Sequence, residues 1–594
     1  RLCPAGCSCI GWLDWSEVVG MFGWARCPAR SGNAKGNDTT TVAKTKFMQG
    51  KSSMVLVAKP EAFERCSFSA ACLGRENKDI ERKFILSPDL PRTERCNFGY
   101  VNNSRLCYSC ESGYSHAGDL SGRCSKCPPK AENIGVGITA GIFGFVGVLG
   151  YLYITLSDGG STDSKDSFKM IGLNFVQLLS LLSTFPIEWP PIFTAIFQVG
   201  GAITALGQHF VNLKCLYPQY TDAEVFYSVV LIWAVMPFAL NAVICLAWLV
   251  AKEMFPKKVR NVWQNMKSCV VALCYLLYPT LCAQTFSIFA CRSVCPGSSD
   301  ASDYLRADLE EQCGIGRHLA FSLLLGVPMF ICFVLGLPLV GLYTVWRIRR
   351  AARNAKHGRT SMHLQIKSFR VYGMLFSMFR EDQWYWESTL ATRKVVFAAI
   401  GVFGGNLGQF QVHLTSMFLM FVILATAIVR PFELGKYGKM LQLLELSSLM
   451  AVWLTLWSGL VFFSYPRCEA YYGAARNDED ESSDGYRPGQ TLVWCDALSV
   501  ITGIMDVCVV IAVVVALLYT MKEKKKEKDI QATINKGHGG RYSNFNMAAL
   551  AGIAKSTQEF AIDLEKRTHS SREFDLEKRH SRIISEVHEA SQRR

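Results

Sequence analysis

Two carboxylates lie inside apolar stretches that are long enough to cross a membrane. Asp506 lies near the middle of the last such stretch, with Thr502 about one helical turn earlier. Glu445 lies about one turn inside the preceding stretch, with Ser448 on the same face. An uncompensated carboxylate in hydrocarbon is costly, so we expect it to be protonated, paired, or in contact with water or a cation. If the two stretches are neighbours, these residues line one ion path, in which acidic side chains favour cations.

A structural interpretation competes with the ion path for Glu445. At its depth the carboxylate can lie near the lipid headgroups and pair with Lys439 or Lys436, which precede it in the chain. Basic side chains near the end of a membrane helix commonly reach the headgroup region in this way.

A second group of charged and aromatic residues lies at the start of the stretch 387–405. It comprises Trp384, Trp386, Glu387, Arg393 and Lys394. Interfacial tryptophans and snorkelling basic side chains are typical membrane anchors, which is the structural interpretation. The alternative is a gating linker or lipid site, because residues 347–386 combine basic and aromatic groups that suit an anionic lipid surface.

The sequence contains no pattern typical of an enzyme or a metal centre. It has no HExxH, P-loop or GxSxG motif and no GxGxxG after a strand, and His209, His318 and His413 are isolated from one another. We therefore predict no enzymatic activity, no catalytic residue, no metal site and no cofactor.

The elements that position these residues are apolar stretches in a chain of 594 residues, of which 50% are hydrophobic and 19% charged. A soluble domain carries nearer a quarter charged residues, and about 20 apolar residues suffice to cross a bilayer. Nine stretches qualify, at approximately 134–156, 168–186, 224–251, 264–288, 318–346, 387–405, 408–430, 441–464 and 497–520. The predicted fold is an all-α polytopic membrane bundle of about nine transmembrane helices.

Two markers orient these helices. Lys and Arg gather in alternate loops, for example at 347–359 and 522–528, and such loops are typical of the cytoplasmic side. Cysteines gather in the opposite loops, as at Cys291, Cys295 and Cys313. The loop after the first stretch is the one predicted inner loop that lacks an excess of positive charge. Together the markers predict an N-out/C-in chain, with an extracellular N-terminus and a cytoplasmic C-terminus.

The region before the first apolar stretch holds eleven of the chain's 23 cysteines. This density is typical of disulfides in an oxidising compartment, and Asn37 and Asn102 begin N-glycosylation sequons. Two CxxC pairs, at 107–110 and 124–127, would also suit zinc, but extracellular thiols oxidise, which favours disulfides. The predicted region is small, disulfide-rich and of loop or β type. The disulfide candidates here and in the outer loops are Cys66, Cys72, Cys96, Cys107, Cys110, Cys124, Cys127, Cys291, Cys295, Cys313, Cys468 and Cys495.

The predicted domains are an extracellular cysteine-rich region (1–132), a transmembrane domain (133–521) and a basic, helical cytoplasmic tail (522–594). Because the chain begins with Arg, we expect a signal peptide or a larger ectodomain upstream. After the double proline at 190–191, the apolar segment 192–213 has three interpretations. It lies in the interface, re-enters the membrane, or packs over the bundle.

Residues 96–128 resemble a known extracellular module. Two Gly-Tyr pairs, at 99–100 and 113–114, alternate with the CxxC pairs. This pattern is similar to the ephrin-receptor-like, EGF-related repeat. The upstream Cys66-x5-Cys72 resembles the segment that precedes such repeats in surface proteins of algae and other protists. The resemblance implies a stapled module that leads directly into a polytopic membrane domain; the plainer interpretation is a set of disulfide spacers.

The membrane domain carries a second resemblance, over about 134–520. Its motifs are Leu178 to Ser183 before Trp189-Pro190, Trp384-Tyr385-Trp386-Glu387 before Arg393-Lys394, and Gln409-Phe410-Gln411 with Arg430-Pro431-Phe432. Together they resemble the transient-receptor-potential-like (TRP-like) membrane proteins of fungi and protists, which include flavin-carrier and polycystin-related members. The resemblance implies a multi-span protein linked to the permeation of cations, mainly calcium, at cell or organelle membranes.

Three functions are compatible with the sequence. The first is a TRP-like, calcium-permeable cation channel with an extracellular sensing or tethering module. The second is a non-conducting receptor or anchor that holds an extracellular structure or matrix, which the scarcity of charge in the spans favours. The third is a lipid or small-solute transporter. The expected partners are membrane lipids, calcium or other cations and an extracellular protein or matrix, but no nucleic acid. The expected location is the plasma membrane or another cell-surface membrane, including a ciliary one, and the oligomeric state stays open.

Overall fold

The computed structural model describes most of the helical part of the chain and some of the cysteine-rich part. The longer described ranges are 63–68, 96–116, 123–157, 164–183, 213–254, 261–295, 302–354, 371–432, 437–464 and 493–537, with short gaps in some of them and a few residues elsewhere. Residues 1–517 form one compact unit and residues 518–594 a second. The sites described below lie in the first unit.

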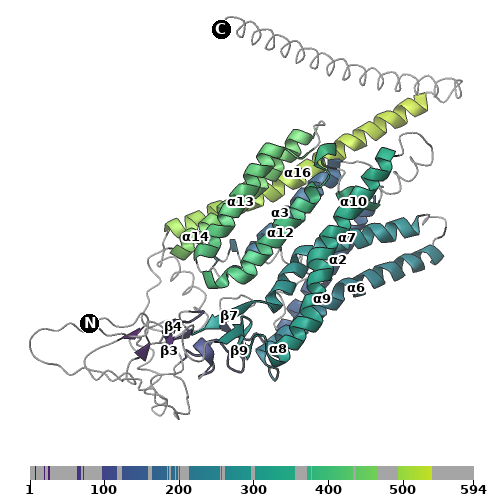
Figure 1. Ribbon diagram of the computed structural model, residues 1–594. Coiled ribbons are helices and arrows are strands. Elements are labelled where there is room, and N and C mark those ends of the chain that lie inside the picture. The colour runs from purple at the N-terminus through teal and green to yellow at the C-terminus, as the bar shows by residue number, and fades with distance from the viewer. Residues whose placement is uncertain are drawn as a thin grey trace, which may run out of the picture. The chain divides into compact units, whose positions relative to one another are not determined.

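Helices dominate the described residues (Figure 1). The main ones are α2 (Lys130–Ser157), α3 (Ser164–Leu182), α6 (Asp222–Met254), α7 (Val262–Ile288), α10 (Leu337–Asn354), α12 (Trp386–Phe403), α13 (Gln409–Val429), α14 (Gly438–Ser464) and α16 (Val493–Gly537). The short helices α5 (Leu213–Leu216), α8 (Gly316–Phe321) and α9 (Val327–Met329) lie between them. Helices α13 and α14 pack side by side as an antiparallel pair (Figure 1).

One long helix is assembled from several pieces. From Gly316 to Asn354, α8, α9 and α10 are joined by the π-helical turns Ser322–Gly326 and Phe330–Gly336. Pro328 and Pro338 lie within this run, and a proline removes one backbone donor from the regular helical ladder. A π-turn relaxes the local crowding without ending the helix.

Seven helices in the described part of the chain are long and apolar enough to cross a membrane. The predicted count of nine is therefore not confirmed. The two stretches that do not qualify, 168–186 and 387–405, form α3 and α12, which are interior helices. The apolar part of α3 is short, Ser167–Leu182, and α12 carries Glu387, Arg393 and Lys394. The fold is a mostly helical membrane bundle, as predicted, with a disulfide-rich N-terminal region.

Burial separates the inner helices from the outer ones. In α7 and α14 more than half of the most apolar residues are buried inside the protein, whereas α6, α13 and α16 bury about a third or less of theirs. The exposed residues are large and apolar, for example Leu246 on α6 and Phe421 on α13. An apolar surface of this extent requires a nonaqueous surrounding, which for these helices is the lipid bilayer.

Residues on both sides of the double proline pack onto the bundle. Trp189, Phe193 and Phe197 are buried against one another, and Phe193 also contacts Phe462 at the end of α14. Of the three interpretations of the segment 192–213, its described residues fit packing over the bundle.

Small antiparallel sheets form the rest of the described fold. The strands are β1 (Cys7–Ser8), β2 (Val19–Gly20), β3 (Trp24–Arg26), β4 (Phe63–Arg65), β5 (Tyr114–His116), β6 (Cys124–Lys126), β7 (Cys291–Val294), β8 (Ser302–Leu305) and β9 (Asp308–Gln312). They pair as β1-β2, β3-β4, β5-β6 and β7-β8-β9. The loop sheet β7–β9, between α7 and α8, packs through Val294, Tyr304 and Leu309 against the cysteine-rich region.

Disulfides staple this region. The structure joins Cys66 to Cys72, Cys96 to Cys107, Cys110 to Cys124, Cys127 to Cys215 and Cys291 to Cys313. Cys295 and Cys495 are also disulfide-bonded, whereas Cys468 lies outside the described residues. The bond from Cys127 to Cys215 ties the module to α5, a pairing that the spacing of the cysteines did not indicate. Asn102 is exposed in a turn, and Asn37 lies outside the described residues.

Candidate functional site

Asp506 is the most deeply placed carboxylate of α16. It is 1% exposed, and its Oδ2 lies 2.8 Å from the hydroxyl of Thr455 on α14. The Thr455 hydroxyl also lies 3.0 Å from the carbonyl oxygen of Ala451. A hydroxyl has one proton to donate. Both contacts are therefore hydrogen bonds at the same time only if Asp506 is protonated and donates to Thr455.

The second carboxylate oxygen of Asp506 has no partner. Oδ1 is buried and accepts no hydrogen bond from any residue that the structure describes. The nearby buried hydroxyls of Ser458, Thr502 and Ser499 donate to carbonyl oxygens of their own helices. Their oxygen lone pairs stay available, so the surroundings of Asp506 offer acceptors rather than donors. A proton or a cation is the partner that this arrangement lacks.

Glu445 forms a buried ion pair with Arg393. The two side chains lie on α14 and α12, their N–O distance is 2.8 Å, and each is 2% exposed. The structure thus differs from the predicted pairing with Lys439 or Lys436. Lys439 is exposed, and Lys436 lies outside the described residues. The interpretation of Arg393 as a snorkelling anchor is wrong, because its side chain is only 2% exposed and is enclosed by protein.

The ion pair and Asp506 lie at different levels of the bundle. Glu445 and Thr455 are ten residues apart on α14, which corresponds to about 15 Å along a helix that rises 1.5 Å per residue. Ten residues are also close to three turns, so both side chains lie near one face of α14. The last two spans contact each other at Thr455 and Asp506. The two carboxylates do not share one binding site.

Lys394 belongs to a second polar cluster. Its ammonium lies 4.1 Å from the centroid of the Tyr275 ring on α7, a cation–π contact. The Tyr275 hydroxyl donates to Oδ1 of Asn174 on α3 over 2.6 Å. Gln177, one turn further along α3, donates to the Tyr275 carbonyl oxygen over 3.3 Å. These contacts tie α3, α7 and α12 together.

Glu387 completes this cluster at the start of α12. It lies seven residues before Lys394, nearly two helical turns, and its carboxylate interacts with the Lys394 ammonium and the Tyr275 hydroxyl. Its Oε2 atom is buried and has no hydrogen-bond partner among the described residues. The two aromatic candidates differ in placement: Trp386 is buried in the bundle, whereas Trp384 is half-buried and lines a cavity.

Arg306 connects the loop sheet to the membrane helices. It lies between β8 and β9, and its guanidinium donates to the carbonyl oxygen of Val402 at the C-terminal end of α12 over 2.6 Å. A cation there also stabilises the helix dipole. Its own carbonyl oxygen accepts a hydrogen bond from the Tyr108 hydroxyl of the cysteine-rich region. Burial lowers the pKa of Arg306. Arg306 thus connects the cysteine-rich region to the end of α12.

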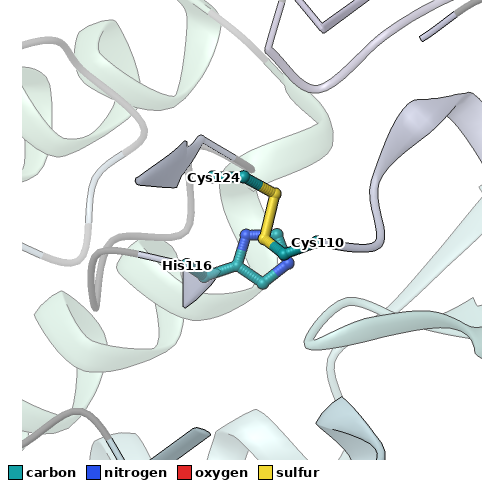
Figure 2. Close-up of side chains that lie close together, drawn as sticks. All are labelled: Cys110, His116 and Cys124. Atoms are coloured by element: carbon teal, nitrogen blue, oxygen red, sulfur yellow. A yellow bond between two sulfur atoms is a disulfide. The ribbon is translucent and has the colours of Figure 1, made fainter. Parts of the chain in front are cut away.

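Two clusters of cysteine and histidine have the composition of metal sites. Figure 2 shows the first, in which Cys110 and Cys124 are joined by a disulfide beside the ring of His116. The second combines the disulfide of Cys291 and Cys313 with His318. A thiolate, not a disulfide sulfur, binds a metal ion. In this oxidised state neither cluster is a metal site.

Several residues of the site were missed in the sequence. Arg306, Tyr275 and Asn174 contact residues more than 90 positions away, and no local pattern indicates these partners. Thr455 could have been found from the sequence, because it lies seven residues, about two helical turns, after Ser448 and so on the same face of the helix. Polar residues on one face of an otherwise apolar span indicate a functional face.

Comparison with known proteins identifies the class of the membrane domain. Residues 221–464 match the family described as Transient receptor potential (TRP) ion channel. The match begins at α6 and ends with α14, so it includes Arg393, Glu445 and Thr455 but not Asp506. Over these residues the protein is similar to TRP ion channels, which supports a cation-channel-like membrane protein; that family is generally not enzymatic. Searches of the curated proteins and of the solved structures found no match.

Proposed function

We propose that this protein is a cation channel that admits calcium, and that Asp506 lines its ion path. The observation that carries the proposal is the buried carboxylate of Asp506 in a membrane bundle, whose Oδ1 atom has no hydrogen-bond partner among the described residues. The TRP family match supports the same function. A carboxylate at this depth requires a proton or a cation as counter-charge, and a channel supplies the cation.

The neighbouring hydroxyls suit calcium as that cation. Calcium ions bind oxygen ligands. The Thr455 hydroxyl contacts the carboxylate, Ser458 lies one helical turn from Thr455, and Thr502 lies one turn from Asp506. In this proposal the Asp506 proton and the permeating ion compete for one carboxylate. Lower pH therefore reduces the current.

Glu445 takes a different role in this proposal. Because Arg393 neutralises it, Glu445 attracts a cation only when the ion pair opens. We assign the pair to gating: it holds α12 and α14 together in the closed state, and its separation exposes a second acidic position along the path. Ser448 lies one turn from Glu445 on the same face.

The orientation of the chain and the role of its cysteine-rich region are part of the proposal. Positive charge in alternate loops and cysteine in the others support an extracellular N-terminus in a cell-surface membrane. Contacts from Tyr108 to Arg306, and from Arg306 to Val402, offer a route by which a force or a ligand outside the cell acts on α12. The extracellular module is then the sensing or tethering element.

Whole-cell recording tests the ion path. The surface-expressed chain is compared with Asp506→Asn and with Glu132→Gln, which removes an exposed carboxylate from the first turn of α2. We expect a cation current whose calcium permeability falls about tenfold in Asp506→Asn, because about 1.4 kcal/mol of lost attraction has that effect. Glu132→Gln should leave it unchanged. Equal permeability in all three proteins would exclude Asp506 from the path. Absence of current at confirmed surface expression would favour the non-conducting anchor.

A further inference from the structure

A cavity of about 310 Å³ lies between α7, α10 and α12. Its walls are mainly apolar and include Val271, Leu337, Val340 and Leu375. This volume is at the lower end of the range for small-molecule sites. An apolar cavity does not hold ordered water well, and leaving it empty lowers the stability of the protein. The cavity therefore favours an apolar occupant.

The polar groups of the cavity are gathered on α12 and α7. Glu387 and Lys394 are two of its lining residues, and Tyr275 is a third. Glu387 Oε2 is buried without a hydrogen-bond partner among the described residues, so it can accept a hydrogen bond from a ligand. Lys394 is held by the Tyr275 ring and interacts with the Glu387 carboxylate.

The charges that line the cavity determine that the polar head group of the ligand is neutral. The carboxylate of Glu387 and the ammonium of Lys394 compensate each other, so a ligand with a net charge would add an uncompensated charge to a buried site. A neutral hydroxyl head adds none, and it can donate its proton to Oε2. The apolar walls then cover a body of hydrocarbon.

The cavity is accessible from the outer surface of the bundle. Val340 lines it and is 64% exposed on α10, a helix that belongs to a membrane-spanning candidate. An occupant can thus enter sideways from the lipid. Half-buried Trp384 also lines the cavity, and tryptophan is common at the level of the headgroups. This placement suits a molecule with its polar end near the interface.

We propose that this cavity binds a neutral membrane amphiphile, with its hydroxyl head on Glu387 and its hydrocarbon body between α7 and α10. A sterol and a monoacylglycerol share this chemistry. The site lies apart from Asp506, and its occupancy does not depend on whether the protein conducts ions.

Photolabelling of the full-length chain in lipid nanodiscs tests the proposal. The probes are a photoreactive sterol, a photoreactive monoacylglycerol and a photoreactive fatty acid that carries a carboxylate. Peptide mapping by mass spectrometry locates the labelled residues. We expect one of the two neutral probes to label α7, α10 or α12 at the cavity, which also identifies the source of the ligand. Labelling there by neither probe would overturn the proposal. Equal labelling by the fatty acid would overturn the selection of a neutral head.

Matched variants separate binding from general membrane contact. Val340→Trp narrows the cavity, whereas Leu339→Trp places the same side chain at a neighbouring position that is 60% exposed and does not line the cavity. We expect about tenfold less labelling in Val340→Trp and in Glu387→Gln, as loss of a charged hydrogen bond predicts, and unchanged labelling in Leu339→Trp. Monodisperse gel filtration confirms that each variant is folded. Equal labelling of Val340→Trp and Leu339→Trp would contradict the site.

Discussion

Replacing Arg393 with methionine removes the positive partner of a buried carboxylate. Glu445 and Arg393 are each 2% exposed, so the remaining charge cannot reach bulk water without a rearrangement of α12 and α14. Breaking a buried pair from one side costs about 3–5 kcal/mol. We expect the same cost for Glu445→Leu, because it leaves the guanidinium unpaired.

The double variant Arg393→Met/Glu445→Leu should be much less damaged than either single variant. Replacing both members of a buried pair with apolar residues of similar volume is often neutral or stabilising. The two substitutions should therefore compensate each other by about 3 kcal/mol or more, which is near the upper end of the interaction energies measured for residues in contact.

Thermal unfolding in detergent, followed by gel filtration with fluorescence detection, measures these effects. In larger domains the unfolding midpoint shifts by at least about 2 °C for each kcal/mol of lost stability. Each single variant should therefore unfold about 6–10 °C below the native chain. The exposed pair of Arg380 and Asp382 is the control, and Asp382→Asn should shift the midpoint by about 2 °C or less. If the losses of the two single variants simply add in the double variant, Arg393 and Glu445 do not form the pair described here.

Three other polar residues give further predictions. Thr455→Val removes the hydroxyl that accepts the Asp506 proton, which disfavours the protonated carboxyl, so protons should block the calcium current less and the current should be less sensitive to external pH; an unchanged pH profile would argue against contact between the two side chains in the working protein. Arg306→Met removes the hydrogen bond to the Val402 carbonyl oxygen and should cost about 1–3 kcal/mol, measured as a lower unfolding midpoint. Arg306→Lys should restore part of this loss, and full retention of stability in Arg306→Met would contradict the contact. The Oδ2 atom of Asp308 accepts a hydrogen bond from the backbone amide of Ala223. Burial raises the pKa of the Asp308 carboxyl group, so the native chain binds the carboxyl proton more tightly than the unfolded chain does. Its contribution to stability is largest below the unfolded pKa of about 3.9 and is lost as pH rises through the raised pKa. The unfolding midpoint of Asp308→Asn should not fall in this way as pH rises. If the midpoints of the native chain and of Asp308→Asn change equally with pH, Asp308 does not have a raised pKa.

The helices of the membrane domain could be predicted from hydropathy because their chemistry is local. The stretches predicted at 264–288 and 441–464 correspond closely to α7 and α14. Length and apolarity are properties of the sequence itself. The count of nine spans is not confirmed at α3 and α12, because the apolar part of α3 is short and α12 carries three charged residues.

The partners of buried charges could not be predicted in the same way. Whether Arg393 reaches lipid headgroups or pairs with Glu445 depends on which helices are neighbours and on their rotation, neither of which is encoded within a single span. Arg306 is a loop residue with no motif around it, yet it contacts the end of α12. The ionisable character of Asp506 at mid-span did indicate a buried carboxylate, whereas its hydroxyl partner Thr455 required the packing of α14 on α16.

The proposed function requires that this chain conducts cations by itself. Purified full-length protein is therefore placed in a planar bilayer, with unequal concentrations of a calcium salt on the two sides. We expect unitary currents that reverse near the calcium equilibrium potential, with the reversal shifted toward that of the anion in Asp506→Asn. Correctly folded protein that gives no unitary current, or currents selective for the anion, would contradict it.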